Sequence, residues 1–187
     1  KGYGIETDIH ATKDHEFICF HDFTLNRIFN KKDSVKNLNY SQIKKMGIQN
    51  KNPVPLLKDL LKTSKNKHPL FIEIKPIFSK PLLKKLLKET SKFSKCTFIS
   101  FKHKNIYNLL KLKSNLKVGL SFAPPVSIKS IIKKSNNKKI NCLIMDKFYL
   151  KSKSIQDLKI KKYFYTVKTK LEFNKFNKNN NLIFENL

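Results

Sequence analysis

The stretch Gly4-Ile5-Glu6-Thr7-Asp8-Ile9-His10 alternates between two kinds of residue and decides the fold. Successive side chains of a strand point to opposite faces, so Glu6, Asp8 and His10 share one face of a predicted strand. Carboxylates on a buried face are costly unless they are protonated, paired or bound to a cation. The stretch therefore indicates either a cation site on a buried strand or solvated acids on an exposed one.

A second strand favours the cation site. The run Leu70-Phe71-Ile72-Glu73-Ile74-Lys75 again places an acid and a base on one face of an apolar strand. The chain holds only 13 acidic residues against 40 basic ones, so acids at strand centres are unlike randomly placed surface residues. We predict that Glu6, Asp8 and Glu73 bind a divalent cation, Mg²⁺ or Ca²⁺, because carboxylate oxygens are its preferred ligands. Lys75 is then predicted to bind a substrate phosphate, although a plain surface lysine remains the alternative.

Short apolar runs alternate with amphipathic segments along the rest of the chain, and this order is typical of an α/β fold with parallel strands. The predicted strands cover residues 4–9, 17–21, 70–74, 97–101, 118–122, 143–146, 163–167 and 182–184. Apolar stripes at helical spacing predict helices around residues 56–61, 82–87, 106–110 and 128–132. Ser79 and Pro81 are suited to the N-cap and first turn of the second helix. The polar segment 22–52 is predicted to be a small insertion loop.

The length predicts one domain, residues 1–187, that forms an incomplete TIM-type (β/α) barrel. Such barrels take about 250 residues and rarely fewer than about 200, whereas this chain has 187. If 17–21 is only a hairpin partner of the first strand, about seven parallel strands remain of the eight that close a barrel.

The formal charge of +27 suggests an anionic partner, yet only one of the 40 basic residues, Arg27, is an arginine. The lysines are spread along the whole chain, which indicates solvated faces rather than a specific nucleic-acid site. Three separated cysteines in apolar runs indicate neither a disulfide framework nor a zinc site, and they favour a reducing, cytoplasmic location. No apolar stretch reaches the roughly 20 residues of a membrane span. The oligomeric state is not predicted.

His21 ends the second strand-like run, where a histidine is well placed for proton transfer at the active end of a barrel. Together, the stretches 4–14 and 20–27 closely resemble the glycerophosphodiester phosphodiesterase family, and 55–61 and 71–75 resemble its later segments. The resemblance implies a TIM-type barrel that cleaves glycerophosphodiesters to glycerol 3-phosphate and an alcohol in lipid metabolism. It also implies that Glu6, Asp8 and Glu73 bind the metal, that Lys75 contacts phosphate and that His21 is one member of a general acid/base pair.

The resemblance has departures. The family's opening His-Arg-Gly strand and its Glu-Asn helix have no match. We therefore expect one strand–helix unit and the other catalytic histidine to be missing from these residues, and the piece alone to lack activity. Two alternatives stay open. One is a phospholipase of the sphingomyelinase D type with the same metal ligands. The other is a non-catalytic basic module that binds acidic lipid or nucleic acid, for which steeply salt-dependent binding would be the sign.

Overall fold

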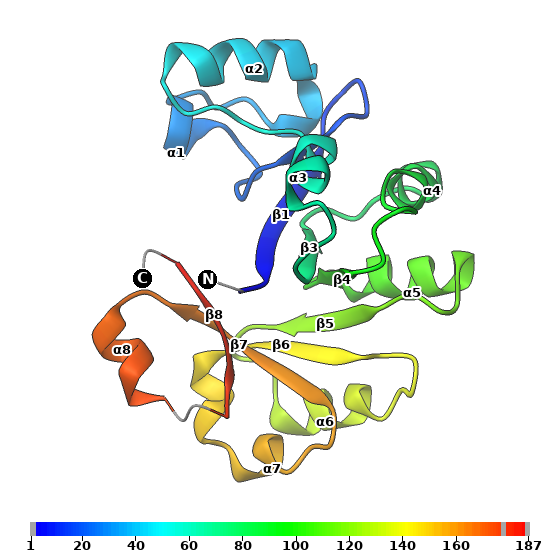
Figure 1. Cartoon of the computed structure of the whole chain (residues 1–187), viewed down its shortest axis with the longest axis vertical. Helices are drawn as coiled ribbons and strands as arrows, with labels where there is room; N and C mark the ends of the chain where they lie inside the picture. Colours follow the sequence, from blue (N-terminus) through cyan, green and yellow to red (C-terminus); the bar gives the residue numbers. More distant parts are fainter. Residues whose placement is uncertain (1–2, 177–178, 186–187) are drawn as a thin grey trace.

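The computed structural model describes residues 3–176 and 179–185 and contains one eight-stranded sheet (Figure 1). The strands are β1 (Ile5–Ala11), β2 (Phe17–Cys19), β3 (Leu70–Ile74), β4 (Cys96–Ser100), β5 (Val118–Phe122), β6 (Cys142–Asp146), β7 (Lys161–Val167) and β8 (Asn181–Phe184). Their order in the sheet is β2-β1-β3-β4-β5-β6-β7-β8. Each strand coincides with a predicted one, apart from small shifts at the ends.

Only β2 runs against its neighbour. It pairs antiparallel with the end of β1, where Ile9 faces Cys19 and Ala11 faces Phe17, whereas the other seven strands are parallel. Within the described residues, no pairing joins β1 to β8; instead, the ring of Tyr3 packs edge-on against that of Phe184 at 5.2 Å. The prediction of an incomplete α/β barrel is therefore confirmed.

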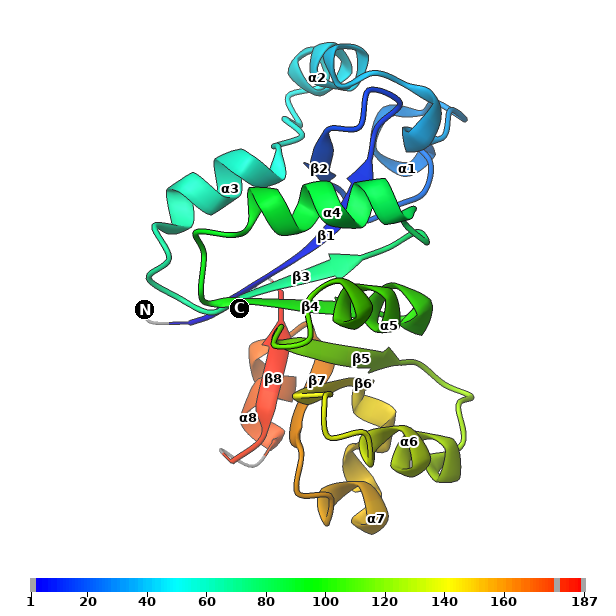
Figure 2. The same ribbon diagram turned by 90° about the vertical axis from the view of Figure 1, so that its right-hand side faces the viewer.

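Helices connect the parallel strands and cover the outer side of the sheet (Figure 2). They are α3 (Leu57–Ser64), α4 (Lys80–Glu89), α5 (His103–Leu112), α6 (Ile128–Ser135), α7 (Lys153–Gln156) and α8 (Lys170–Lys175), with a 3₁₀ helix η2 (Lys147–Lys151) after β6. At α4, the Ser79 side chain accepts a hydrogen bond from the Leu82 amide and Pro81 lies in the first turn, as predicted. None of the helices in the described ranges combines the length and apolar character needed to cross a bilayer.

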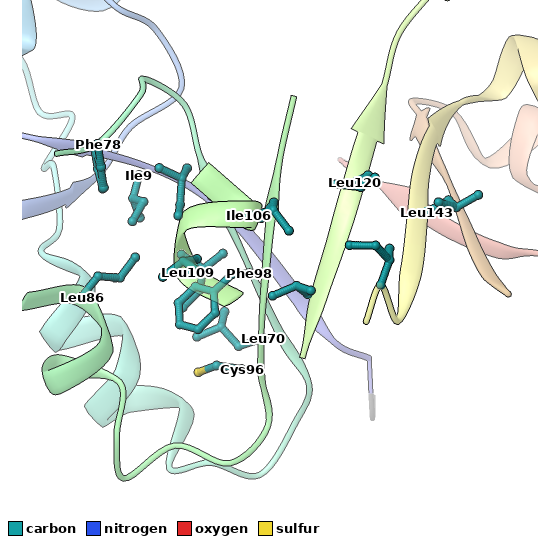
Figure 3. Close-up of a cluster of buried hydrophobic side chains, with 14 of the residues drawn as sticks. Ile9, Leu70, Phe78, Leu86, Cys96, Phe98, Ile106, Leu109, Leu120 and Leu143 are labelled. Carbon is teal, nitrogen blue, oxygen red and sulfur yellow. The ribbon is translucent and has the colours of Figure 1, made fainter. Parts of the chain in front are cut away.

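Two groups of buried side chains hold the curved sheet. The larger one lies between the sheet and its helices and includes Ile9, Leu70, Phe98, Leu109 and Leu120 (Figure 3). The smaller one lies on the opposite face of the strands, where Ile99, Cys142 and Ile144 pack with aromatic residues of β3 and β7. The two-residue period of β1 and β3 places their acids together on the inner face.

The segment 22–52 is more ordered than the predicted loop. It contains α1 (Asn26–Phe29), a 3₁₀ helix η1 (Val35–Asn37) and the ten-residue helix α2 (Tyr40–Gln49). A separate group of apolar side chains, which includes Leu25, Phe29 and Ile43, packs beneath α2. This small unit stands apart from the sheet in Figure 1 and follows the antiparallel strand β2. We propose that it is an insertion in one barrel domain.

Candidate metal and phosphate site

Three carboxylates converge on the inner face of β1 and β3. The register of the parallel pair places Asp8 directly beside Glu73, and Glu6 lies one pleat repeat before Asp8. One carboxylate oxygen from each residue lies within 4.8 Å of the other two. The structure thus brings together the three residues that the sequence proposed as metal ligands.

The electrostatics of this group favour a bound cation. Burial raises the pKa of Glu6 to about 8, and repulsion by Asp8 and Glu73 adds to that rise. Burial also raises the pKa of Glu73, which is 6% exposed. Three crowded oxygen donors, among which Glu6 and Glu73 resist ionisation, match the chemistry of a hard divalent cation, whose charge offsets the cost of ionising buried carboxylates. The donor set therefore fits Mg²⁺ or Ca²⁺.

Lys75 is the counter-ion of the group. Its Nζ lies 2.9 Å from Glu73 Oε1 and 3.2 Å from Asp8 Oδ1, and the side chain is only 13% exposed. Burial alone would lower the pKa of Lys75, but the carboxylates of Glu73 and Asp8 outweigh it and raise the pKa above its usual value. The ammonium group therefore stays charged beside the carboxylates, within reach of an anion that enters the site.

His21 lies on the loop that leaves β2 and returns alongside β1. The amide of Phe20 donates to the carbonyl of Asp8 at 3.0 Å, so the next residue, His21, stands close to the acidic group. The imidazole side chain is 65% exposed, and its Nδ1 lies 2.7 Å from Asp22 Oδ1. The ring is accessible to solvent while one of its nitrogens is held.

Asp22 is itself fixed by Arg27. The guanidinium group donates from Nε at 2.6 Å and from Nη2 at 3.1 Å to the two oxygens of Asp22. These hydrogen bonds lower the pKa of Asp22 to about 2, so the carboxylate stays charged at neutral pH. Sequence reasoning included Asp22 and Arg27 in the family pattern but assigned them no structural role.

Two further features were not predicted. His10, 3% exposed, places Nε2 3.3 Å from the carbonyl oxygen of His21 and packs edge-on against the ring of Phe23. Phe101 lies 5.8 Å from the ring of Tyr165, with the Lys75 ammonium 6.0 Å from the Phe101 ring. The position of Phe101 at the end of the predicted strand 97–101 was the available signal, because residues at strand ends face the same end of a barrel.

Known proteins share the family and the fold of this chain. The model of the "Glycerophosphoryl diester phosphodiesterase family" matches residues 2–181. A search of curated proteins found no match. The fold is similar to a putative glycerophosphoryl diester phosphodiesterase from Agrobacterium tumefaciens, with a TM-score of 0.82 and 16% identity over 97% of this chain and 81% of the other.

Two other solved structures are similar to the same extent. A phosphodiesterase from Oleispira antarctica, solved in complex with the product sn-glycerol-3-phosphate, gives a TM-score of 0.81 at 15% identity, over 97% of this chain and 80% of the other. The glycerophosphodiester phosphodiesterase from Thermotoga maritima gives 0.78 at 18% identity with the same shares. At these identities the structures establish the common fold.

Proposed function

The chain belongs to the glycerophosphoryl diester phosphodiesterase family, and from this premise we propose that it hydrolyses glycerophosphodiesters to glycerol 3-phosphate and an alcohol with the help of a divalent cation. The observation that carries the proposal is the convergence of Glu6, Asp8 and Glu73 beside the ammonium of Lys75. A purely cationic binding surface would gain nothing from three carboxylates on buried strand faces, because burying a charged group costs free energy.

Glu6, Asp8 and Glu73 would hold the Mg²⁺ or Ca²⁺. When bound, the cation supplies positive charge next to the non-bridging phosphate oxygens, where negative charge increases during the reaction. The three side chains come from adjacent strands of one sheet, so the site is built on a rigid part of the fold. Such a site requires little reorganisation when the substrate enters.

Lys75 is the proposed phosphate ligand. Its flexible stem allows the ammonium to turn from Asp8 and Glu73 to an oxygen of the substrate. The aromatic pair Phe101 and Tyr165 beside it gives the carbon skeleton of the substrate an apolar wall. Lysine and aromatic rings together would orient the phosphate and exclude water from one side of it.

His21 is the proposed acid/base residue. The Asp22 carboxylate accepts the hydrogen on Nδ1, so the ring presents Nε2 for proton exchange with the attacking or the leaving oxygen. Arg27 positions the residue through Asp22 and touches no reacting atom in this proposal. The role matches the general acid/base catalysis in which a charged carboxylate fixes the tautomer of the imidazole.

The test is the release of glycerol 3-phosphate by the intact protein from glycerophosphocholine, glycerophosphoethanolamine and glycerophosphoglycerol, with Mg²⁺ or Ca²⁺ and with a chelator. We expect metal-dependent release that the D8N/E73Q variant lacks. Asp59, an exposed acid of α3, gives the matched control D59N. No release with any divalent metal would refute the proposal, and release of a cyclic phosphate or of a different headgroup would favour the related phospholipase.

A further inference from the structure

Large exposed apolar side chains gather at one end of the barrel. Within the described part of the chain, eight such side chains are exposed, and six of them follow the end of a strand. These six, here called the apolar rim, are Phe23, Ile77, Phe101, Ile128, Phe148 and Leu171. The other two are Tyr3, which precedes β1, and Ile48, on the outlying helix α2.

The rim lies at the same end of the sheet as the site already described. Carboxyl ends of parallel strands lie on one face of a barrel, and Figure 2 shows the arrowheads of β3 and β5 pointing to the same side. Ile77 follows β3, the strand that holds Glu73 and directly precedes Lys75, and Phe23 contacts His10 near the end of β1. The apolar side chains thus share a face with the acidic group.

The exposure is large for side chains that water hydrates poorly. Phe148 and Leu171 are both 70% exposed, Ile77 is 57% exposed and Phe23 is 51% exposed. Scattered apolar residues are normal on a protein surface, but their concentration on one face marks a site of interaction. The opposite face, at the amino ends of the strands, has no comparable group among the described residues apart from Tyr3.

Lysines alternate with the rim along the chain. Lys102, Lys129 and Lys170 are exposed and directly adjoin Phe101, Ile128 and Leu171. Since lysines occur over the entire chain, the charge alone does not single out this face. The combination of lysines with aliphatic and aromatic side chains distinguishes this face. An anionic bilayer can take up apolar groups beneath its headgroups and bind lysines between the headgroups.

We propose that the apolar rim is a docking surface for an anionic lipid bilayer. Nucleic acid would use the lysines, but it offers no favourable environment to Ile77 or Leu171. Docking on this face would direct the acidic group and Lys75 towards the headgroup phosphates. Taken with the proposed function, on which this last step rests, the substrates are then glycerophosphodiesters that retain an acyl chain and remain in the membrane.

The test is co-sedimentation with vesicles of phosphatidylglycerol and phosphatidylcholine mixed, and with vesicles of phosphatidylcholine alone. We expect preferential binding to the anionic vesicles, weakened at least about tenfold in the variant I77S/F148S/L171S. The matched control, Y3S/I48S, removes the two exposed apolar side chains outside the rim and is expected to bind as the original protein does. The single variant F148S, on the most exposed ring, repeats the test with minimal change to the fold.

Equal binding by the rim variants and the original protein would overturn the proposal and assign any vesicle binding to the lysines alone. Absence of binding to anionic vesicles would overturn it too and favour a protein partner for the rim. The binding measurement needs no catalysis. Vesicle binding by the intact protein without any release of glycerol phosphate or of its acylated form would refute the proposed function and leave the docking surface in place.

Discussion

The ammonium group of Lys75, which directly follows β3, lies 2.9 Å from a carboxylate oxygen of Glu73, two residues earlier in the chain. This ion pair has two consequences for the proposed site. The ion pair stabilises the charged form of Lys75. It also places that positive charge at the position where a divalent cation would interact most strongly with the carboxylates. The lysine and the metal therefore compete for the same negative charge until a substrate phosphate attracts the ammonium away.

The first prediction follows from this competition. In the variant K75M, the site loses a positive charge but keeps its three carboxylates, so we expect Mg²⁺ or Ca²⁺ to bind several-fold to about tenfold more tightly, a gain of up to ~1.4 kcal/mol. Turnover of glycerophosphodiesters is expected to fall about a hundredfold, because the phosphate loses its point charge. Isothermal titration with the metal and a product assay measure the two effects separately.

A rise in metal affinity together with a fall in turnover would distinguish this interpretation from a purely structural role of Lys75. The matched control is K62M, an exposed lysine on α3, which should change neither quantity. Weaker metal binding by K75M would show that the lysine supports the carboxylates rather than competing for them.

The second prediction concerns Glu6, whose pKa is raised from 4.5 to about 8. The folded protein holds this proton more tightly than the unfolded chain, so the stabilising contribution is complete below about pH 4.5 and is lost as pH rises through about 8. In the variant E6Q the side chain remains neutral. Without metal, we expect E6Q to be more stable than the original protein by about 1–3 kcal/mol above pH 8.

Urea unfolding at several pH values in the presence of a chelator measures this difference. D59N, which changes an exposed acid, is the control for the loss of one carboxylate. Addition of Mg²⁺ should reduce the advantage of E6Q, because the metal stabilises only the protein that retains its ligands. A difference between E6Q and the original protein that does not vary with pH would contradict the buried proton.

The third prediction concerns the pair His21 and Asp22. Replacement of Asp22 by asparagine removes the charge that holds Nδ1 of His21 and leaves one oxygen, instead of two, to accept hydrogen bonds from Arg27. We expect kcat of D22N to fall about 10- to 100-fold, whereas KM changes little, since the residue orients an acid/base group and binds no substrate. Steady-state kinetics with a glycerophosphodiester measure both constants.

The matched control is D33N, which changes an exposed acid of the same 22–52 segment and is expected to leave kcat and KM unchanged. A rise in KM with an unchanged kcat would instead place Asp22 in substrate binding.

The strands were predictable because their patterns are local. In 70–74 and 118–122, short apolar runs bounded by polar residues leave few alternatives to a buried strand, and the structure has both with the predicted bounds. The acids at positions 6, 8 and 73 stood out for the same reason, since a charged residue in such a run needs a partner. The fold and the family could thus be predicted from local patterns that begin with the first strand.

Helix α2 was not predictable from its own residues. It buries only Ile43 and Gly47, and its stability depends on the group of apolar side chains around Leu25 and Phe29 that the fold assembles beneath it. Similarly, the contact of Lys75 with Asp8 depends on the register that pairs β1 with β3. Such relationships arise from tertiary packing, which a pattern in one segment does not contain.

The last prediction concerns His103 at the start of α5. Its Nε2 lies 2.9 Å from the carbonyl oxygen of Ser121, and its Nδ1 lies 3.0 Å from the Nζ of Lys134 on α6. The ring thus donates to Ser121 and accepts from Lys134, which requires a neutral imidazole. Burial, aided by the charge of Lys134, lowers the pKa of His103, although the contact with Ser121 opposes that shift.

Because the unfolded chain binds this proton more tightly, the stabilising contribution is present above the ordinary pKa of about 6.5 and is lost as pH falls through the lower folded value. We expect the H103Q variant to show a flatter decline of stability than the original protein below about pH 6.5. H68Q, which changes a histidine of the loop before β3, is the control. Parallel pH profiles for H103Q and the original protein would mean that the helix α5 contact tolerates a charged ring and that acid sensitivity arises elsewhere.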